Sequence, residues 1–255
     1  MVLKVPIVPI VLSLSLRPSS LTAGMWTSAI VPNVLVPCTK PMPPLQSPLM
    51  KLFFSIFFAM LIMANPSFSA ETKVLAFAGS LRTDSANKKL IREAAAIAKE
   101  LGATVTVIDL KEYPIPLYDG DIEEKDGMPE KAKQLRRMML DAQVIMISSA
   151  EYNSSLPGVL KNVIDWMSRK EEKGPSRDAF KGKKFIIMSA SPGKLGGSRA
   201  LAHLRGIIDE IGGPGTVLPQ QLSLSDSYNA FDGEGHLKDP KLKSDLRRLV
   251  QSAIQ

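Results

Sequence analysis

From residue 71 onward, short apolar runs alternate with stretches in which apolar residues recur every three or four positions. Continuous apolar runs are typical of strands buried in a parallel sheet, and the second spacing is typical of amphipathic helices. The five strands are expected at 74–77, 105–108, 144–147, 185–188 and 216–218. The five helical stripes lie at 90–101, 132–142, 160–167, 201–211 and 242–253. This alternation predicts one α/β domain with a doubly wound five-stranded parallel sheet.

Three polar connections of this predicted domain follow strands directly, at 79–87, 149–158 and 189–199. Ligands of an open parallel sheet bind beyond the carboxyl ends of its strands. Right-handed crossovers bring these ends to the same edge while the helices cover both faces. We therefore expect the functional site to be built from these three connections.

The first 70 residues differ in composition from the rest of the chain. They contain no Asp or Glu, and they hold 10 of the 19 prolines. Within them, a basic start at 50–51 precedes an apolar run at 52–64 and small residues up to Ala70, which matches a secretory signal peptide. That run is shorter than the roughly 20 residues of a membrane-spanning helix.

We therefore divide the chain into a leader or mis-assigned extension at 1–49, a signal-peptide-like segment at 50–70 and a folded domain at 71–255. A start of translation at Met50 would place the signal where such signals normally lie. Use of this signal implies export, to the periplasm in a bacterium. Without it, the protein is expected in the cytoplasm.

Charge and cysteine content narrow the chemistry of the folded domain. All 25 acidic residues and 28 of the 32 basic residues lie beyond residue 70, because only four basic residues precede it, so this part carries about +3. So small a charge gives no indication of a nucleic-acid partner. The single cysteine, Cys38, precedes the domain, which can therefore form neither an internal disulfide nor a thiolate metal site.

The connection at 79–87 has the character of an anion site. It joins a buried strand to a helix start, where free backbone N–H groups and the helix dipole favour a phosphate. Ser80, Ser85 and Asn87 add short polar groups, and the Arg82 guanidinium can hold two phosphate oxygens. The simpler alternative is an ordinary helix start with Ser85 or Asn87 as its N-cap. The Walker A and G-x-G-x-x-G patterns are both absent.

The other two connections suit the planar part of a ligand. Tyr152, flanked by polar neighbours at a strand's carboxyl end, suits a heterocycle with polar edges. Three glycines between 193 and 197 let the backbone approach a ligand closely. Taken singly, each connection could equally be a structural loop.

Taken together, the three connections carry a resemblance to a known family. The motifs are G-S-L-R-x-x-S-x-N at 79–87, E-Y-N-x-S-x-P-G-x-L-K-N-x-I-D-W at 151–166 and S-P-x-x-x-G-G-x-R at 191–199. In this order, after these strands, they resemble the NADPH-dependent FMN reductase family, whose members have a flavodoxin-like fold. The resemblance extends over essentially all of residues 73–255.

This resemblance implies an enzyme that uses FMN to pass electrons from NADPH or NADH to a small acceptor, such as a quinone, chromate, an azo compound or free flavin. It also implies a homodimer or homotetramer. Because the flavin carries the electrons, no catalytic side chain and no metal are expected. One position departs from the family, since Ala150 stands where proline is usual, and this loop loses a fixed φ.

The residues implied in cofactor binding fall into two groups. The first holds the FMN phosphate and comprises Ser80, Arg82, Ser85 and Asn87. The second lies around the isoalloxazine and comprises Glu151, Tyr152, Asn153, Gly196 and Gly197. Ser191, which begins the third motif, is a further cofactor-binding residue.

Three other functions stay open at this point. One is a flavodoxin-like electron carrier without enzymatic activity, although such carriers tend to be strongly acidic. Another is a flavodoxin-like binding module that lacks FMN. The third is a hydrolase, because Ser198 lies in an approximate nucleophile elbow and Asp226 or Asp232 with His236 completes the order Ser, Asp, His. His236 is expected in a solvated loop, and His203 on the surface of its helix.

Overall fold

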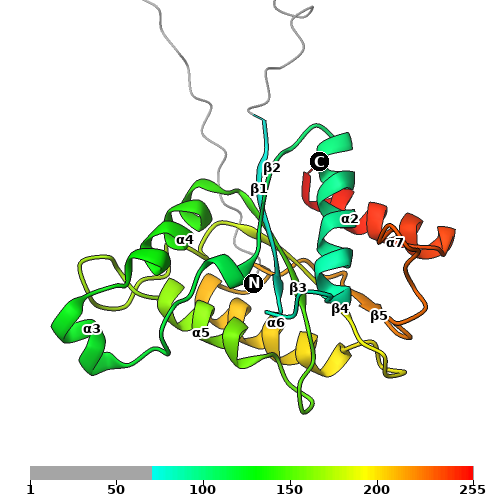
Figure 1. Ribbon diagram of the computed structural model, residues 1–255. Coiled ribbons are helices and arrows are strands. Elements are labelled where there is room, and N and C mark those ends of the chain that lie inside the picture. Colours follow the sequence, from blue (N-terminus) through cyan, green and yellow to red (C-terminus); the bar gives the residue numbers. More distant parts are fainter. Residues whose placement is uncertain (1–70, 255) are drawn as a thin grey trace, which may run out of the picture. The chain divides into compact units, whose positions relative to one another are not determined.

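Five parallel strands form the sheet at the centre of the computed structural model, which describes residues 71–254 (Figure 1). Their order is β2-β1-β3-β4-β5, and each neighbouring pair is parallel. This is a common doubly wound order, so the predicted flavodoxin-like fold is confirmed. The predicted segments 1–49 and 50–70 lie outside the described residues. The strands are β1 (Lys73–Gly79), β2 (Thr104–Ile108), β3 (Val144–Ser149), β4 (Lys184–Ala190) and β5 (Leu222–Leu224).

Helices cover both faces of the sheet (Figure 1). Helices α2 and α7 pack on one face, and α4, α5 and α6 pack on the other. No helix within residues 71–254 is both long and apolar enough to cross a membrane. The helices of this part of the chain are α2 (Ala86–Glu100), the 3-10 helix η1 (Leu110–Glu112), α3 (Gly120–Asp126), α4 (Glu130–Asp141), α5 (Gly158–Met167), α6 (Ser198–Gly212) and α7 (Pro240–Ile254).

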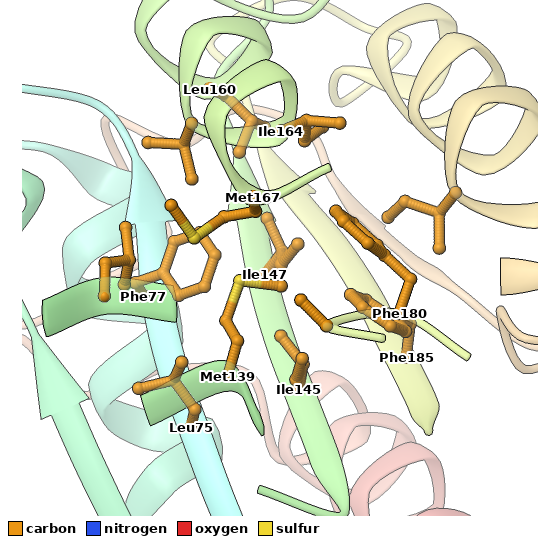
Figure 2. Packing of buried hydrophobic residues seen from close by; sticks show 14 of the residues in the cluster. Leu75, Phe77, Met139, Ile145, Ile147, Leu160, Ile164, Met167, Phe180 and Phe185 are labelled. Atoms are coloured by element: carbon orange, nitrogen blue, oxygen red, sulfur yellow. The ribbon is translucent and has the colours of Figure 1, made fainter. Parts of the chain in front are cut away.

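Alternation along the strands divides the core into two clusters. In β1, Leu75 and Phe77 face α4 and α5, whereas Val74 and Ala76 face α2 and α7. Figure 2 shows the first cluster, in which the Phe77 ring lies among apolar side chains from β3, α4 and α5. Burial of a Leu, Ile, Val, Phe or Met side chain stabilises the fold by roughly 1.5–3 kcal/mol. The two clusters therefore stabilise the sheet whose carboxyl edge carries the three connections.

The fifth strand is not where the sequence predicted it. Val217 makes a single parallel bridge with Phe185, and the true β5 begins five residues later. Side chains occupy the backbone groups of the predicted strand, because Arg205 binds the carbonyl oxygens of Val217 and Leu218 while the Asp209 carboxylate accepts from the Val217 N–H. The Thr216 carbonyl and the Leu218 N–H still pair with Phe185, but Arg205 takes the Leu218 carbonyl, so the ladder ends at this single bridge.

Helix α3 was not predicted at all. Its sequence has Ile122 as its one large apolar residue, so it shows no helical stripe. Polar contacts hold it instead. The Asp119 side chain accepts a hydrogen bond from the Asp121 N–H at its start, and the buried Glu123 carboxylate pairs with Arg169 at 2.8 Å.

Candidate cofactor site

Asn87 joins the first and third connections at the carboxyl edge of the sheet. This side chain is buried in the first turn of α2. Its Nδ2 donates to the Ala190 carbonyl at 2.9 Å, and its Oδ1 accepts from the Ala190 N–H at 2.8 Å and from the Ser148 hydroxyl at 2.9 Å. These three bonds tie the start of α2 to the ends of β3 and β4. Asn87 was predicted to hold a phosphate, and the structure uses most of its polar capacity to fix the loop.

The first connection keeps its other polar groups available. Ser85 stands at the N-cap position of α2, but its side chain makes no capping hydrogen bond. Within the described residues, the backbone N–H groups of Thr83, Asp84 and Ser85 donate to no protein acceptor. Arg82 is exposed. The carboxylate of Asp84, which would repel an anion, pairs with Lys89 at 2.7 Å.

The second connection contains a tight turn that presents Tyr152. Tyr152 and Ser155 exchange two backbone hydrogen bonds of 3.0 and 3.1 Å around Asn153 and Ser154. Both central residues have positive φ, 51° and 65°, as in a type I′ turn, which is uncommon for residues other than glycine. The Tyr152 side chain is left half-exposed beside the carboxyl end of β3.

Glu151 ties the second connection to α6. Its Oε2 accepts from the backbone N–H groups of Arg199 and Ala200, each at 3.1 Å, and Oε1 lies 3.6 Å from the Arg199 guanidinium. A carboxylate at this place satisfies free donors and complements the helix dipole. Glu151 was predicted to line the isoalloxazine, and its carboxylate is directed to the helix start.

The glycines of the third connection allow close backbone packing. Gly196 and Gly197 have φ of 58° and 84°. A Cβ on Gly197 would stand 1.7 Å from the Ser189 Oγ, and one on Gly196 would stand 2.8 Å from the Ser223 carbonyl carbon. Both positions therefore require glycine. Ser191 fixes the same connection from its other end, since its N–H donates to the Leu224 carbonyl and its hydroxyl accepts from the Gly193 N–H.

Ser189 was not predicted as part of the site. Its Oγ is buried at the end of β4 and has no hydrogen-bond partner within the described residues. It lies directly under Gly197. A small polar residue at the end of an otherwise apolar strand was the signal for it in the sequence.

The donor set suits FMN. Free N–H groups at a helix start, short hydroxyls and an exposed guanidinium match a phosphate monoester. A half-exposed aromatic ring and a glycine pair lie on the other two connections, where a planar ring system would meet close backbone on one side. The structure thus brings the three predicted connections to one edge of the sheet.

The hydrolase arrangement is not formed. His236 Nδ1 lies 2.5 Å from Glu93 Oε1 on α2, which covers the face of the sheet opposite to α6 and Ser198. His203 is exposed on α6, as predicted, and its Nδ1 lies 2.9 Å from the Ser155 Oγ. His236 was expected to be simply solvated, whereas it pairs with a buried carboxylate.

Comparison with known proteins agrees with this geometry. The family model described as NADPH-dependent FMN reductase matches residues 72–229. An NAD(P)H-dependent FMN reductase of Pseudomonas aeruginosa is 35% identical over 187 residues, which cover 73% of this chain and 94% of that protein. A quinone reductase of Escherichia coli K12 is 36% identical over 143 residues, covering 55% and 71% of the two chains.

A solved structure agrees with these sequence matches. FerB, a flavoenzyme NAD(P)H:(acceptor) oxidoreductase from Paracoccus denitrificans, superposes with a TM-score of 0.57 at 26% identity, covering 72% of this chain and 95% of FerB. The match to the family model takes in all three connections of the site and all five strands. The chain therefore belongs to the NADPH-dependent FMN reductase family.

Proposed function

We propose that this protein is an FMN-dependent NAD(P)H oxidoreductase that reduces small quinone-type acceptors. The observation that carries the proposal is the arrangement at the carboxyl edge of the sheet, in a chain that belongs to a reductase family. The relatives named as FMN reductase and quinone reductase support both the electron donor and the acceptor class.

The residues of the first connection would hold the FMN phosphate. The free N–H groups at the start of α2 and the hydroxyls of Ser80 and Ser85 supply neutral donors, and Arg82 supplies charge. Tyr152 and Asn153 would meet the isoalloxazine from one side, and Gly196 and Gly197 from the other. The chemistry that FMN supplies when bound is the acceptance of two electrons from NAD(P)H and their delivery to the acceptor.

The protein contributes position rather than a reacting side chain. Asn87 and Glu151 hold the connections against β3, β4 and α6. The positive-φ turn presents the half-exposed Tyr152 side chain, whose ring would cover one face of the flavin and exclude water from it. Nicotinamide and acceptor then use the same small site in turn, which predicts ping-pong kinetics.

The test is anaerobic mixing of the purified yellow protein with NADPH. The oxidised flavin band should bleach, and added quinone should restore it, with parallel lines in double-reciprocal plots of the steady-state rates. A colourless protein, or NADPH oxidation without bleaching, would contradict the proposal. An electron carrier would bleach only when a partner protein is supplied.

We also propose that the protein is a homodimer or homotetramer. Within residues 71–254, five of the eight exposed large hydrophobic residues lie in the connections that follow the five strands, one in each. An apolar rim of this kind favours contact with a second subunit or with the acceptor. Light scattering of the eluted protein tests the assembly, and a monomer would overturn it. The rim residues are Leu81, Leu117, Tyr152, Leu195 and Tyr228.

Export is a further proposal, and it rests on the signal-like segment at 50–70 alone. Cleavage after Ala70 would release a chain that begins at Glu71. N-terminal sequencing of the protein from its own host tests this. Cytosolic protein that retains residues 50–70 would contradict it.

A further inference from the structure

Four cations surround the first connection, and two of them are already neutralised. Lys88 Nζ lies 2.6 Å from the Asp109 carboxylate, and Lys89 Nζ lies 2.7 Å from the Asp84 carboxylate. Both acidic groups are thereby compensated by protein. The charges of Lys88 and Lys89 are therefore committed within the fold.

In residues 71–254, Arg82 and Lys111 are the two that form no ion pair, although Arg82 acts through space on Asp84 and Lys111 on Asp109. Within residues 71–254, neither has a carboxylate oxygen within 4.0 Å, although ion pairs of that length are common elsewhere in the domain. Lys111 lies in η1, after β2, so it reaches the site from a different connection. Its Nζ donates to the Thr83 Oγ1 at 3.3 Å, and its backbone N–H is fixed by the Asp109 carboxylate at 3.0 Å.

Two buried hydroxyls mark the same place. Ser80 is 1% exposed and Ser85 is 6% exposed. The Ser80 Oγ accepts from the Arg82 N–H at 3.3 Å, and the protons of both hydroxyls have no acceptor within the described part of the chain. The Ser80 Oγ already has the Arg82 N–H as a partner and the Ser85 Oγ is accessible from outside, so both hydroxyl protons are available to an acceptor that reaches the connection from solvent.

We propose that Lys111 is a second cation for the FMN phosphate, acting from the β2 connection together with Arg82. A phosphate monoester carries a charge of about −1.5 to −2 at pH 7, which one guanidinium does not neutralise. Lys111 stands against Thr83, next to Arg82 in sequence, so the two positive charges flank one short loop. This inference rests on the proposed function, since it needs FMN at this site.

The test compares two ligands that differ only in the phosphate. The protein freed of flavin is titrated with FMN and with riboflavin, and flavin fluorescence gives both dissociation constants. Lys111→Met should weaken FMN by roughly tenfold and leave riboflavin within about twofold. Lys111→Arg should restore most of the FMN affinity, because it keeps the charge.

Lys125→Met is the matched control, since Lys125 is exposed on α3 outside the three connections and its loss should change neither constant. The FMN dissociation constant of the Lys111→Met variant should also rise less steeply with salt than that of the parent protein. Circular dichroism and Tm confirm that each variant is folded. Lys111 does not act on the phosphate if the folded Lys111→Met variant binds FMN as tightly as the parent protein does. The same conclusion follows if its affinities for FMN and riboflavin fall by the same factor.

Failure of the proposed function gives a different result. A parent protein that binds neither FMN nor riboflavin would overturn both proposals. A parent protein that binds FMN and is reduced by NADPH, beside an unaffected Lys111→Met variant, would overturn only the assignment of Lys111.

Discussion

Asn87 shows how one amide can hold a whole site together. Its substitution by alanine leaves the Ala190 backbone groups and the Ser148 hydroxyl without partners in a buried place. Each buried polar group left unsatisfied costs about 1–3 kcal/mol. We expect Asn87→Ala to lower the free energy of unfolding by about 2–4 kcal/mol. Urea denaturation measures this change, and Asn229→Ala, at an exposed position, is the control. Equal unfolding midpoints for the two variants would contradict a stabilising role of the Asn87 hydrogen bonds.

Gly197 offers a sharp test of close packing at the residue scale. In Gly197→Ala the new methyl group meets the Ser189 Oγ and the backbone must keep a φ of 84°. We expect loss of flavin affinity and about 1–3 kcal/mol of stability. In Gly193→Ala the methyl group has its nearest neighbour at 3.7 Å, so this variant should bind flavin normally. Similar flavin binding by both variants would mean that the connection tolerates a shift at 197.

The sequence predicted which three connections meet at the carboxyl edge of the sheet and which polar residues they carry, because the strand pattern and the chemistry of a residue type are local. The sequence could not show which polar groups are available to a ligand and which form hydrogen bonds within the protein. Asn87 and Glu151 bind groups that lie 48 to 103 positions away along the chain. These groups come into contact only after β3, β4 and α6 have packed together.

Helix α6 depends at its start on a side chain from another element. Glu151 supplies the carboxylate there, and its side chain is only 13% exposed. We expect Glu151→Gln to lower the free energy of unfolding by about 0.5–2 kcal/mol, because the charge at the helix dipole is lost while one acceptor is kept. Thermal unfolding measures the change. Glu210→Gln, at the other end of α6 and largely exposed, is the control and should be nearly neutral.

Elements with a strong apolar pattern were predicted, and elements held by polar contacts were not. The four long strands and five helices with apolar stripes lie where their patterns placed them. Helix α3 is held by the Glu123 and Arg169 pair. In the run at 216–218, Arg205 binds two carbonyl oxygens and Asp209 binds one N–H, which leaves a single bridge to β4. Such contacts belong to the tertiary structure, so no local pattern records them.

At the scale of the whole domain, one ion pair makes stability depend on pH. The Glu93 carboxylate beside His236 raises the pKa of that imidazole above 6.5, with the backbone-capping Asp232 acting in the same direction and Lys243 opposing it. Because the folded-state pKa is raised, the contribution is complete below about pH 6.5 and is lost as pH rises through the folded-state value. The free energy of unfolding should therefore fall as the pH rises from about 6.5 through the folded-state pKa of His236.

The measurement is the free energy of unfolding at a series of pH values. His236→Gln should flatten the fall above pH 6.5, whereas His203→Gln, whose imidazole faces a serine hydroxyl, should leave it in place. Glu234 lies 4.0 Å from the far nitrogen of His236 and is itself exposed, so it adds little through solvent. An unchanged slope in His236→Gln would assign the pH dependence to other groups.

The internal ties of Asn87 and Glu151 also bear on how fast the cofactor enters and leaves. Connections that are fixed before the flavin arrives lose little conformational entropy on binding. Uptake of FMN by the empty protein should then be a single phase whose rate rises in proportion to FMN concentration, without the plateau that a slow loop-ordering step produces. A chain stripped of flavin would recover its yellow colour on mixing, at a rate set by encounter with FMN.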